Sequence, residues 1–222
     1  MYSPNPRDDE IKLNIDWKIS NELVAYPEAL EFMENRVGQI IKGNEPETVW
    51  LLEHPPIYTA GTSAKEGGLL DSSRFPVYYT GRGGEFTYHG PGQRIAYIML
   101  DLKSRMKEPD LRKYVNFLEQ LIIDTLGSFD ISGARREGRI GIWTEDKNGK
   151  EEKIAALGVR VKKWVTFHGI SVNINPNLEH FTGIVPCGIK NYGVTSTEKL
   201  GKKISMDDFD REFKKSFEKT YK

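Results

Sequence analysis

Apolar residues recur at helical spacing in three stretches of the chain. In residues 27–42 the apolar positions are Leu30, Met33, Val37, Ile40 and Ile41, and Gly43 follows them as a terminator. In residues 111–127 they are Leu111, Tyr114, Val115, Leu118, Ile122 and Leu126, ahead of Gly127. Residues 205–208 resemble a capping box, and Phe209, Phe213 and Phe217 follow at intervals of four. The pattern predicts three amphipathic helices, of which the last, at 204–220, docks on the body of the protein.

Shorter apolar runs, bounded by Gly, Pro and polar residues, predict strands. These runs are residues 48–53, 77–80, 95–102, 140–144, 153–162 and 164–175. Residues 146–149, Asp-Lys-Asn-Gly, have the chemistry of a hairpin turn, and the last two runs are expected to pair. Because strands and helices follow one another without a regular β-α-β order, we expect an α+β fold with a mixed, largely antiparallel sheet flanked by helices.

The length of the chain, 222 residues, suits a single domain over 1–222 with a sizeable core and an irregular lead-in at 1–20. No run of 18 apolar residues is present, so no membrane-spanning helix is expected. The first twenty residues lack a basic start followed by an apolar stretch, and they are too acidic for a good transit peptide. These features predict a cytoplasmic protein.

The charges balance, with 32 Lys and Arg residues against 32 Asp and Glu residues. A net charge of zero argues against a dedicated nucleic-acid-binding protein, which usually carries a clear basic excess. Two local basic clusters remain, one of Arg135, Arg136 and Arg139 and one of Arg160, Lys162 and Lys163. Each cluster is either solvated surface or a docking patch for an acidic protein partner.

Five glycines fall within residues 80–93, Thr-Gly-Arg-Gly-Gly-Glu-Phe-Thr-Tyr-His-Gly-Pro-Gly-Gln. Glycine lets the backbone approach a ligand closely. The phosphate-binding patterns GxxxxGK[ST] and GxGxxG are absent, so the stretch predicts either the wall of a pocket around an extended ligand or a structural turn. His54, His89 and His168 have no common metal-ligand spacing, so no metal site is predicted. We expect His54 to be a hydrogen-bonded structural residue, and His89 to be either structural or part of the pocket wall.

Two further residues are candidates for chemistry. Cys187 is the only cysteine, which excludes an intrachain disulfide, and it lies between Pro186 and Gly188. That context favours an addressable thiol, although a lone cysteine is often a small buried hydrophobe. Lys153 opens an otherwise small and apolar run. It is either an exposed lysine at a strand end or an ammonium group whose charge a nearby thiolate would stabilise.

Five motifs, in this order, resemble the lipoyl(octanoyl) transferase family, also called lipoate-protein ligase B. They are Glu-His-Pro-Pro-Ile-Tyr-Thr-Ala-Gly at 53–61, Arg-Gly-Gly-Glu-Phe-Thr-Tyr-His-Gly-Pro-Gly-Gln at 82–93, Lys-Ile-Ala-Ala-Leu-Gly-Val-Arg at 153–160, Trp-Val-Thr-Phe-His-Gly at 164–169, and Pro-Cys-Gly at 186–188 with Val-Thr-Ser at 194–196. The resemblance extends over residues 26–200. Ala60 and Thr62 are less typical of the family.

The resemblance implies a fold like that of the biotin and lipoate protein ligases, and an acyltransferase that uses no cofactor and no metal. It implies that Cys187 carries the acyl group as a thioester, and that Lys153 activates the thiol and serves as acid and base. The acyl-binding wall is expected to consist of Arg82, Gly83, Gly84, Glu85, Phe86, Thr87, Tyr88 and His89, with Ala156, Leu157, Gly158, Gly169, Ile170 and Ser171.

The resemblance also implies partners. The donor would be acyl carrier protein, and the acceptors would be lysines of the lipoyl domains of 2-oxoacid dehydrogenase E2 subunits and of the glycine cleavage H protein, in lipoate biosynthesis. These partners are acidic, so Arg135, Arg136, Lys162 and Lys163 are candidate docking residues. No nucleic acid or membrane partner is expected. The alternatives are an ATP-dependent lipoate or biotin ligase on the same fold, an amidotransferase that moves lipoyl groups between proteins, and a non-catalytic acyl-protein-binding module.

Overall fold

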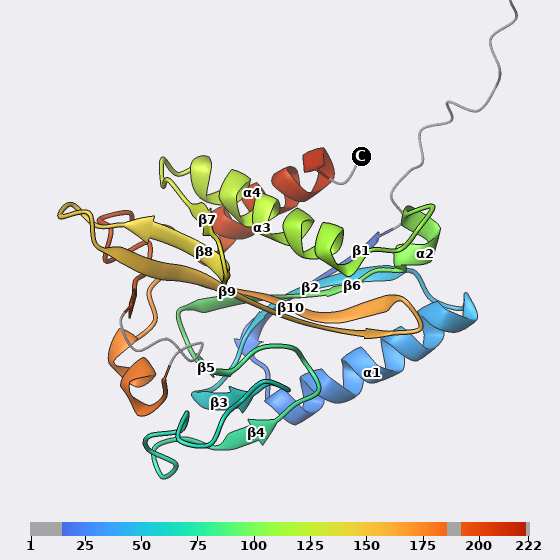
Figure 1. Ribbon diagram of the computed structural model, residues 1–222. Coiled ribbons are helices and arrows are strands. Elements are labelled where there is room, and N and C mark those ends of the chain that lie inside the picture. The colour runs from blue at the N-terminus through green and yellow to red at the C-terminus, as the bar shows by residue number, and fades with distance from the viewer. Residues whose placement is uncertain (1–14, 186–191, 221–222) are drawn as a thin grey trace, which may run out of the picture.

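A computed structural model describes residues 15–185 and 192–220. Within these residues eight strands form a large sheet in the order β1-β2-β6-β10-β9-β8-β7, with β11 beside β9 (Figure 1). Its strands are β1 Ile15–Leu23, β2 Glu47–Glu53, β6 Gln93–Met99, β7 Ala134–Arg136, β8 Arg139–Glu145, β9 Glu151–Lys162, β10 Val165–Asn173 and β11 Gly193–Val194. Among them the pairs β1–β2 and β11–β9 are parallel, and the other pairs are antiparallel. The predicted fold class is therefore confirmed.

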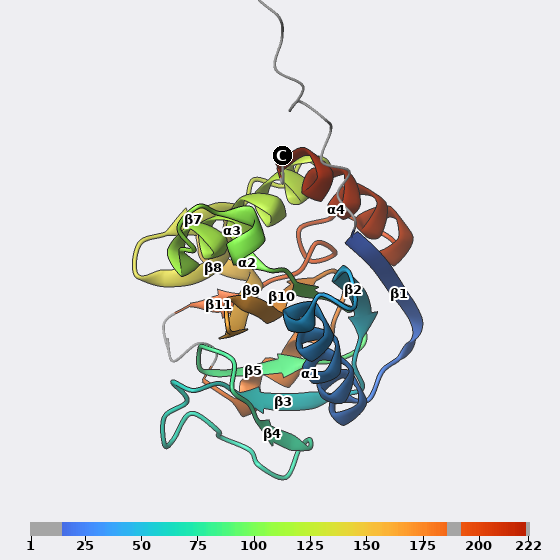
Figure 2. The ribbon, with the colours of Figure 1, turned by 90° about the vertical axis from the view of Figure 1, so that its right-hand side faces the viewer.

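A smaller sheet and the helices cover the two faces of the large sheet. The smaller sheet, in the order β4-β3-β5, consists of β3 Ile57–Ala60, β4 Val77–Tyr79 and β5 Phe86–His89. The helices are α1 Tyr26–Lys42, α2 Leu102–Arg105, α3 Leu111–Gly127 and α4 Met206–Thr220, and Leu178–Gly183 form a short 3-10 helix, η1. Figure 2 shows α3 and α4 on one side of the large sheet and α1 with the smaller sheet on the other. In the described residues no helix is both long and apolar enough to cross a membrane.

Helix α1 follows the predicted apolar stripe closely. Ala29, Met33, Val37 and Ile40 are buried against strands β2, β6 and β10. Gly43 ends the helix with a φ of 75°, and its N–H bonds to the last turn of carbonyl groups. A left-handed residue is needed for this cap, and glycine adopts that conformation without steric cost. The helix predicted at 27–42 is thus confirmed.

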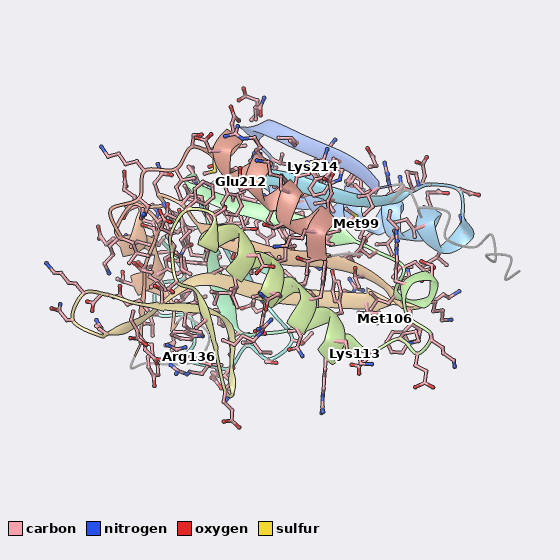
Figure 3. All side chains as sticks on the ribbon, turned by 90° about the horizontal axis from the view of Figure 1, so that it is seen from above. Met99, Met106, Lys113, Arg136, Glu212 and Lys214 are labelled. Atoms are coloured by element: carbon pink, nitrogen blue, oxygen red, sulfur yellow. The ribbon has the colours of Figure 1, made fainter. Side chains whose placement is uncertain are left out.

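Helices α3 and α4 form the opposite layer, and seen from above they lie next to each other across the sheet (Figure 3). The three phenylalanines of α4, Phe209, Phe213 and Phe217, are buried in the core that α4 shares with α3 and the sheet. Ser205 begins the helix as the capping pattern predicts, because its Oγ accepts a hydrogen bond from the N–H of Asp208 at 3.1 Å.

Two segments differ from the sequence-based expectation. Ile15–Leu23 form strand β1, so the lead-in predicted for residues 1–20 extends too far. The strand pairs in parallel with β2. The ring of Trp17 also packs edge-on against that of Phe217, at 5.3 Å between ring centres, although Phe217 is 200 positions later in the chain. Phe86–His89, expected as part of a glycine-rich loop, form β5 by pairing with β3. Both strands depend on distant partners that local pattern does not reveal.

Strand β9 organises the region in which the chemical motifs meet. One edge pairs with β10 from Ala155 to Lys162, as the paired runs predict, and β11 continues that side beside Glu152 and Lys153. On the other edge β8 pairs with β9 only as far as Ala155. Among the described residues, the edge beyond that point is crossed by the glycine-rich stretch, through a hydrogen bond from Gly83 N–H to Val159 O at 2.9 Å.

Candidate active site

Lys153 lies near the start of β9 and is only 6% exposed. Its Nζ donates a hydrogen bond to the main-chain oxygen of Ile140 at 2.8 Å and lies 4.8 Å from the centre of the Trp143 ring. These contacts are needed because burying a charged group costs free energy unless hydrogen bonds or other electrostatic contacts stabilise the charge. The structure thus contradicts the exposed interpretation of Lys153.

Gly141 lets β8 approach the lysine side chain. Its φ is 118°, a value that side chains rarely tolerate. A Cβ at this position would stand 2.7 Å from the main-chain oxygen of Ala155 and 3.2 Å from Cε of Lys153. The glycine therefore allows β8 to wrap around Lys153 and present the Ile140 carbonyl to the amine.

Gly158 lets the glycine-rich stretch lie on β9. A Cβ on Gly158 would stand 2.9 Å from Cδ of Arg82 and 3.0 Å from the main-chain oxygen of Gly83. The side chain of Arg82 thus fills the space that a larger residue would need. The two motifs predicted to form one pocket wall meet here by direct contact.

Arg82 is 7% exposed, and its hydrogen bonds hold the backbone of the glycine-rich stretch against β3. Its guanidinium donates to the main-chain oxygens of Thr59 at 2.8 Å, Gly83 at 2.9 Å and Glu85 at 3.1 Å, and to Oγ1 of Thr59 at 2.7 Å. Arginine suits this task because its donors have a rigid planar geometry. One side chain thereby ties β3 to the residues on both sides of the turn.

These elements enclose a cavity of about 430 Å³. Its wall includes Lys153 and nearly all of the predicted binding residues: Arg82, Gly83, Gly84, Glu85, Phe86, Thr87, His89, Ala156, Leu157, Gly158, Gly169, Ile170 and Ser171. These residues come from three separate stretches of the sequence, 82–89, 153–158 and 169–171, and the fold brings them to one place. Their role in binding stays a prediction.

Tyr88 is the exception, because it does not line the cavity. Its hydroxyl forms a hydrogen bond with Nδ1 of His180 at 2.8 Å, and its ring packs edge-on against Phe181 at 5.2 Å. Neighbouring residues of a strand point to opposite faces, so Tyr88 points away from the side of Thr87 and His89 and packs into the core of the smaller sheet. Phe86 belongs to the same core and also contributes to the cavity wall. The predicted wall therefore has a structural residue within it.

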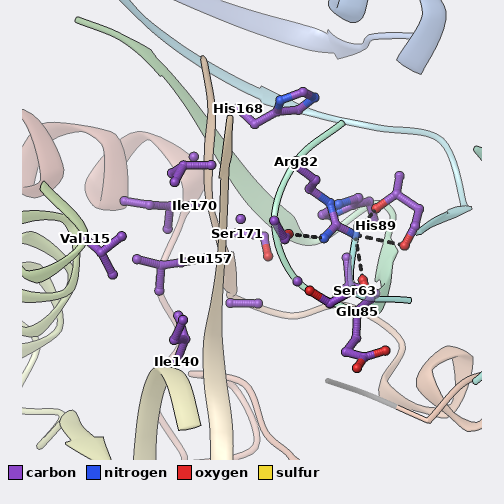
Figure 4. Close-up of a pocket in the computed structure, with 18 of the residues that line it drawn as sticks. Ser63, Arg82, Glu85, His89, Val115, Ile140, Leu157, His168, Ile170 and Ser171 are labelled. Carbon is purple, nitrogen blue, oxygen red and sulfur yellow. Dashed lines mark hydrogen bonds between the residues drawn. The ribbon is translucent and has the colours of Figure 1, made fainter. Parts of the chain in front are cut away.

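The cavity has an apolar side that the sequence did not reveal. Leu111 and Val115 of α3 and Ile140 of β8 line it together with Leu157 and Ile170. Figure 4 shows Val115, Leu157, Ile170 and Ile140 on one side of the strands, and Arg82, His89 and Ser63 on the other. Leu111, Val115 and Ile140 stand outside every recognised motif, and only their apolar character could have marked them.

His54 is buried behind the cavity as a structural residue, which confirms its expected role. Its Nδ1 donates to the main-chain oxygen of Val24 at 2.6 Å, and its Nε2 accepts from the hydroxyl of Tyr97 at 2.7 Å. Burial lowers the pKa of His54 to about 4, against the opposing effect of the Val24 hydrogen bond. His54 is therefore neutral at physiological pH.

His168 lines the cavity in a strained conformation, with a φ of 60°. Its Nε2 lies 3.1 Å from the hydroxyl of Tyr26, whereas its buried Nδ1 has no hydrogen-bond partner among the described residues. Burial, followed by the nearby charges of Arg82 and Arg160, lowers the pKa of His168 to about 3. In the described part of the chain no three His, Cys, Asp or Glu side chains are placed to hold a metal ion.

A model of the family described as lipoyl protein ligase A/B catalytic domain matches residues 25–218. The chain belongs to this lipoyl ligase family. An octanoyltransferase of Bartonella quintana (strain Toulouse) is 56% identical over 215 residues, which cover 93% of this chain and 87% of that protein. An octanoyltransferase of Parvibaculum lavamentivorans is 53% identical over 220 residues, covering 98% and 97%.

Solved structures of the lipoyl ligase family share the fold. A bi-partite lipoate protein ligase from Thermoplasma acidophilum has a TM-score of 0.68 at 12% identity, and the match covers 93% of this chain and 84% of that chain. A lipoate-protein ligase A bound with ATP also has a TM-score of 0.68, at 10% identity, over 92% and 85%. The likeness to a lipoate ligase catalytic domain, expected from the resemblance, is confirmed at the level of fold.

Cys187, the predicted nucleophile of this lipoyl ligase family member, lies outside the described residues. The chain just downstream of it is anchored to the lysine strand. Gly193 and Val194 pair with Glu152 and Lys153, and the N–H of Thr195 donates to the main-chain oxygen of Lys153 at 3.0 Å. Residues 193–195, six to eight positions after Cys187 in the sequence, therefore lie beside Glu152 and Lys153.

The arginines of the two basic clusters pair with neighbouring carboxylates. In the first cluster Arg135 pairs with Glu119 at 3.1 Å, Arg136 with Glu145 and Glu151, and Arg139 with Glu151 at 2.7 Å. In the second, Arg160 pairs with Glu34 at 3.3 Å. All four arginines thus have partners within the molecule, which weakens the prediction that Arg135 and Arg136 dock an acidic protein. Lys162 and Lys163 are exposed at the turn between β9 and β10 and stay candidates for docking.

Proposed function

We propose that this protein is an octanoyltransferase, which moves an octanoyl or lipoyl group from acyl carrier protein to a lysine of a lipoyl domain. The names of relatives at more than 50% identity support octanoyl transfer. The observation that carries the proposal is the cavity, which unites three motifs around a buried lysine and has one apolar side suited to a hydrocarbon chain. The acceptors would be E2 lipoyl domains and the glycine cleavage H protein, in the cytoplasm.

In the first half of the reaction, Cys187 attacks the thioester carbonyl of the acylated carrier. A free thiol has a pKa of about 8.5 and is only a few per cent ionised at pH 7, so a neighbouring group must favour the thiolate. The ammonium group of Lys153 favours the thiolate by its charge. As the C–S bond of the donor breaks, Lys153 gives a proton to the departing carrier thiol, and the acyl group remains on Cys187.

In the second half, a lysine of the acceptor domain attacks the acyl-cysteine as a neutral amine. An ordinary lysine has a pKa of about 10.4, so near neutral pH its ammonium group first loses one proton to solvent. As the C–N bond forms and Cys187 leaves as the thiolate, a base must take a second proton from the nitrogen. Lys153, which has given up a proton in the first half, is available for this step. The product is an amide, which is more stable than the thioester, so the transfer requires no ATP.

The covalent step is tested by intact-mass spectrometry of the protein mixed with octanoyl-acyl carrier protein. The expected result is an adduct heavier by one octanoyl group, which disappears when a lipoyl domain is added. The Cys187→Ala protein should form no adduct and transfer nothing. An absent adduct in the unaltered protein, or normal turnover of Cys187→Ala, would show that the covalent proposal is wrong.

An ATP-dependent lipoate ligase is the second candidate, because a lipoate-protein ligase A bound with ATP has the same fold. Such an enzyme would activate the free acid as an adenylate and would not need Cys187. The two activities separate when free octanoate with ATP is offered in place of octanoyl-acyl carrier protein. We expect modification of the lipoyl domain with the carrier substrate alone.

A further inference from the structure

Helix α3 carries a carboxylate on its buried face. Glu119 is only 6% exposed and lies between Leu118 and Leu121, which belong to the core. Glutamate is almost never buried to this extent unless its charge is paired, because removing the charge from water costs free energy. No step of the proposed reaction uses this side chain, so its partners must indicate its role.

The two oxygens of Glu119 have different partners. Oε2 accepts a hydrogen bond from Nε of Arg135, in β7, at 3.1 Å. The guanidinium of Arg135 is held on α3, because its Nη2 also donates to the main-chain oxygen of Asn116 at 2.9 Å and to Oε1 of Gln120 at 3.1 Å. Oε1 of Glu119 accepts from the buried N–H of Gly141, in β8, at 3.4 Å. The carboxylate therefore connects α3 to both β7 and β8.

The N–H of Gly141 belongs to the same peptide group as the carbonyl of Ile140, which accepts the hydrogen bond from Lys153. This peptide is trans, so it is planar and its N–H and C=O point in opposite directions. Glu119 thus lies 3.4 Å from one edge of the peptide, and Nζ of Lys153 lies 2.8 Å from the other. One peptide group joins the carboxylate to the amine, and the two are less than about 9 Å apart.

Glycine allows this peptide to rotate unless a partner holds it. The φ of Gly141 is 118°, and the residue has no side chain to restrict the peptide before it. We propose that Glu119 is a positioning residue that fixes the Ile140–Gly141 peptide, so that its carbonyl receives the amine of Lys153, and that its charge favours the ammonium form. The peptide dipole agrees with this arrangement, because its negative end faces the amine and its positive end faces the carboxylate. The inference rests on the proposed function for the role of Lys153 as acid and base.

The other charged groups near Lys153 in β8 and β9 have partners of their own. Arg139 of β8 pairs with Glu151 at 2.7 Å, and Glu152 of β9 pairs with Lys199 at 2.7 Å. Strand β11, on the other side of β9, has no charged side chain. Among the described residues, the remaining titratable groups of the cavity wall are Tyr26, Arg82, Glu85, His89, Tyr97 and His168.

Glu119 is itself paired, but its partner is much closer to water. The side chain of Arg135 is 40% exposed, whereas that of Glu119 is 8% exposed. Water and salt therefore screen the charge of the arginine more strongly than that of the carboxylate. The field of Glu119 at the amine of Lys153 is thus only partly cancelled.

The direct test is the reaction of Lys153 with cyanate, a small reagent that carbamylates only a neutral amine. Mass spectrometry of the peptide that contains Lys153 measures the rate between pH 7 and pH 10, and no transfer activity is needed. Glu119→Gln preserves size but removes the charge. We expect Lys153 to react about 3- to 10-fold faster near pH 7.5, because the ammonium form loses a favourable charge nearby. The ratio should approach one at the highest pH, where the amine is largely neutral in both proteins.

Arg135→Gln is the matched control, because it removes the same ion pair from the other side and leaves the carboxylate beside Gly141. If Glu119 served only to connect α3 to the strands, both substitutions would loosen the site and accelerate the cyanate reaction alike. We expect Lys153 in Arg135→Gln to react no faster than in the unaltered protein. Equal rates in Glu119→Gln and the unaltered protein, or the same acceleration in both variants, would overturn the inference.

The consequence for the reaction is measured by single-turnover loading with octanoyl-acyl carrier protein. Glu119→Gln should load about 10-fold more slowly, because the amine of Lys153 is no longer held in one orientation. Its KM for the carrier should stay the same, since Glu119 is buried. A normal loading rate, or a loss confined to KM, would contradict the role of Glu119. Failure of the unaltered protein to load would instead count against the proposed function, and the cyanate rates would still test the effect of Glu119 on Lys153.

Discussion

Lys153 occupies an environment that its residue type normally avoids. It is almost fully buried, between the carbonyl of Ile140 and the ring of Trp143, directly ahead of the apolar residues 154–157 of β9. Lysine is rarely buried, because removing its charge from water costs free energy unless polar groups stabilise that charge. A buried titratable group in a cavity wall is a strong candidate for chemistry.

Lys153→Arg separates charge from proton transfer. Arginine stays protonated, so it can stabilise a thiolate but cannot act as a base. We expect a loss of transfer rate of about 10²- to 10⁴-fold, measured with octanoyl-acyl carrier protein and a lipoyl domain. Lys147→Arg, an exposed change on the neighbouring turn, is the control and should transfer normally. Unaltered transfer by Lys153→Arg would remove the acid and base role.

His54 predicts how stability depends on pH. Its folded pKa of about 4 lies below the ordinary value of 6.5, so the unfolded chain binds the proton more readily. The contribution to stability is complete above about pH 6.5 and is lost as the pH falls toward 4, which amounts to roughly 2 kcal/mol between pH 7 and pH 5. The lowered pKa values of His89 and His168, each about 3, add to the loss over the same pH range, so the part due to His54 is the difference between the unaltered protein and His54→Asn in urea unfolding at the two pH values.

His54→Asn should reduce this loss, although it lowers the stability itself by removing the bond from Tyr97. His180→Asn, at a less buried position, should change the pH dependence less. An identical pH dependence in His54→Asn and the unaltered protein would show that His54 does not titrate as described.

At the scale of elements, the contact between β9 and the glycine-rich stretch builds the cavity. The hydrogen bond from Gly83 to Val159 closes the edge of β9 beyond β8, and Gly158 provides the space for Arg82. The glycine-rich motif at residues 80–93 predicted a close approach of the backbone to a ligand, or a structural turn. The structure shows that one such approach is to another part of the same wall.

Gly158→Ala tests this contact. The added methyl group would stand 2.9 Å from Cδ of Arg82, so Arg82 must shift and the cavity must change shape. Overpacking of this kind costs about 1–3 kcal/mol, and we expect KM for the acyl donor to rise by about 10-fold, with a lower melting temperature. Gly38→Ala, in helix α1 where a Cβ meets nothing within 4 Å, should instead stabilise by about 0.5–1 kcal/mol. A normal KM in Gly158→Ala would contradict this interpretation of the wall.

At the scale of the whole molecule, a buried ion pair joins the C-terminal helix to the centre of the sheet. Nε of Arg94 in β6 donates to Oδ1 of Asp210 in α4 at 2.7 Å, and Nη2 of Arg94 contacts Oδ2. Their side chains are 2% and 6% exposed. Neither charge has access to water, so each depends on the other.

Asp210→Ala should therefore lower the free energy of unfolding by about 3–5 kcal/mol, because Arg94 is left buried without its partner. The double change Arg94→Met with Asp210→Leu should cost less than the single change, since no charge remains in the core. Urea unfolding measures both, and Asp207→Ala, an exposed change in the same helix, should cost less than about 1 kcal/mol. If Arg94→Met and Asp210→Leu made singly together cost as much as the double change, the pair would not be coupled.

The sequence by itself determined the elements and motifs whose information is local. Helical spacing marked α1, α3 and α4, and the apolar runs marked β9 and β10, because periodicity acts over a few neighbouring residues. The motif at 82–89 marked a cavity wall, with the exception of Tyr88. Strand alternation was the signal that could have separated Tyr88 from Thr87 and His89, once β5 was recognised as a strand.

Only the tertiary structure decided how those parts meet. The burial of Lys153 and the apolar side of the cavity from α3 both depend on residues far apart in the chain. Gln93 and Asn173, for example, are 80 positions apart, and Nε2 of Gln93 donates a buried hydrogen bond to Oδ1 of Asn173 at 2.8 Å. Exposure and hydrogen-bond direction are properties of such long-range contacts, because they depend on which groups exclude water from which others.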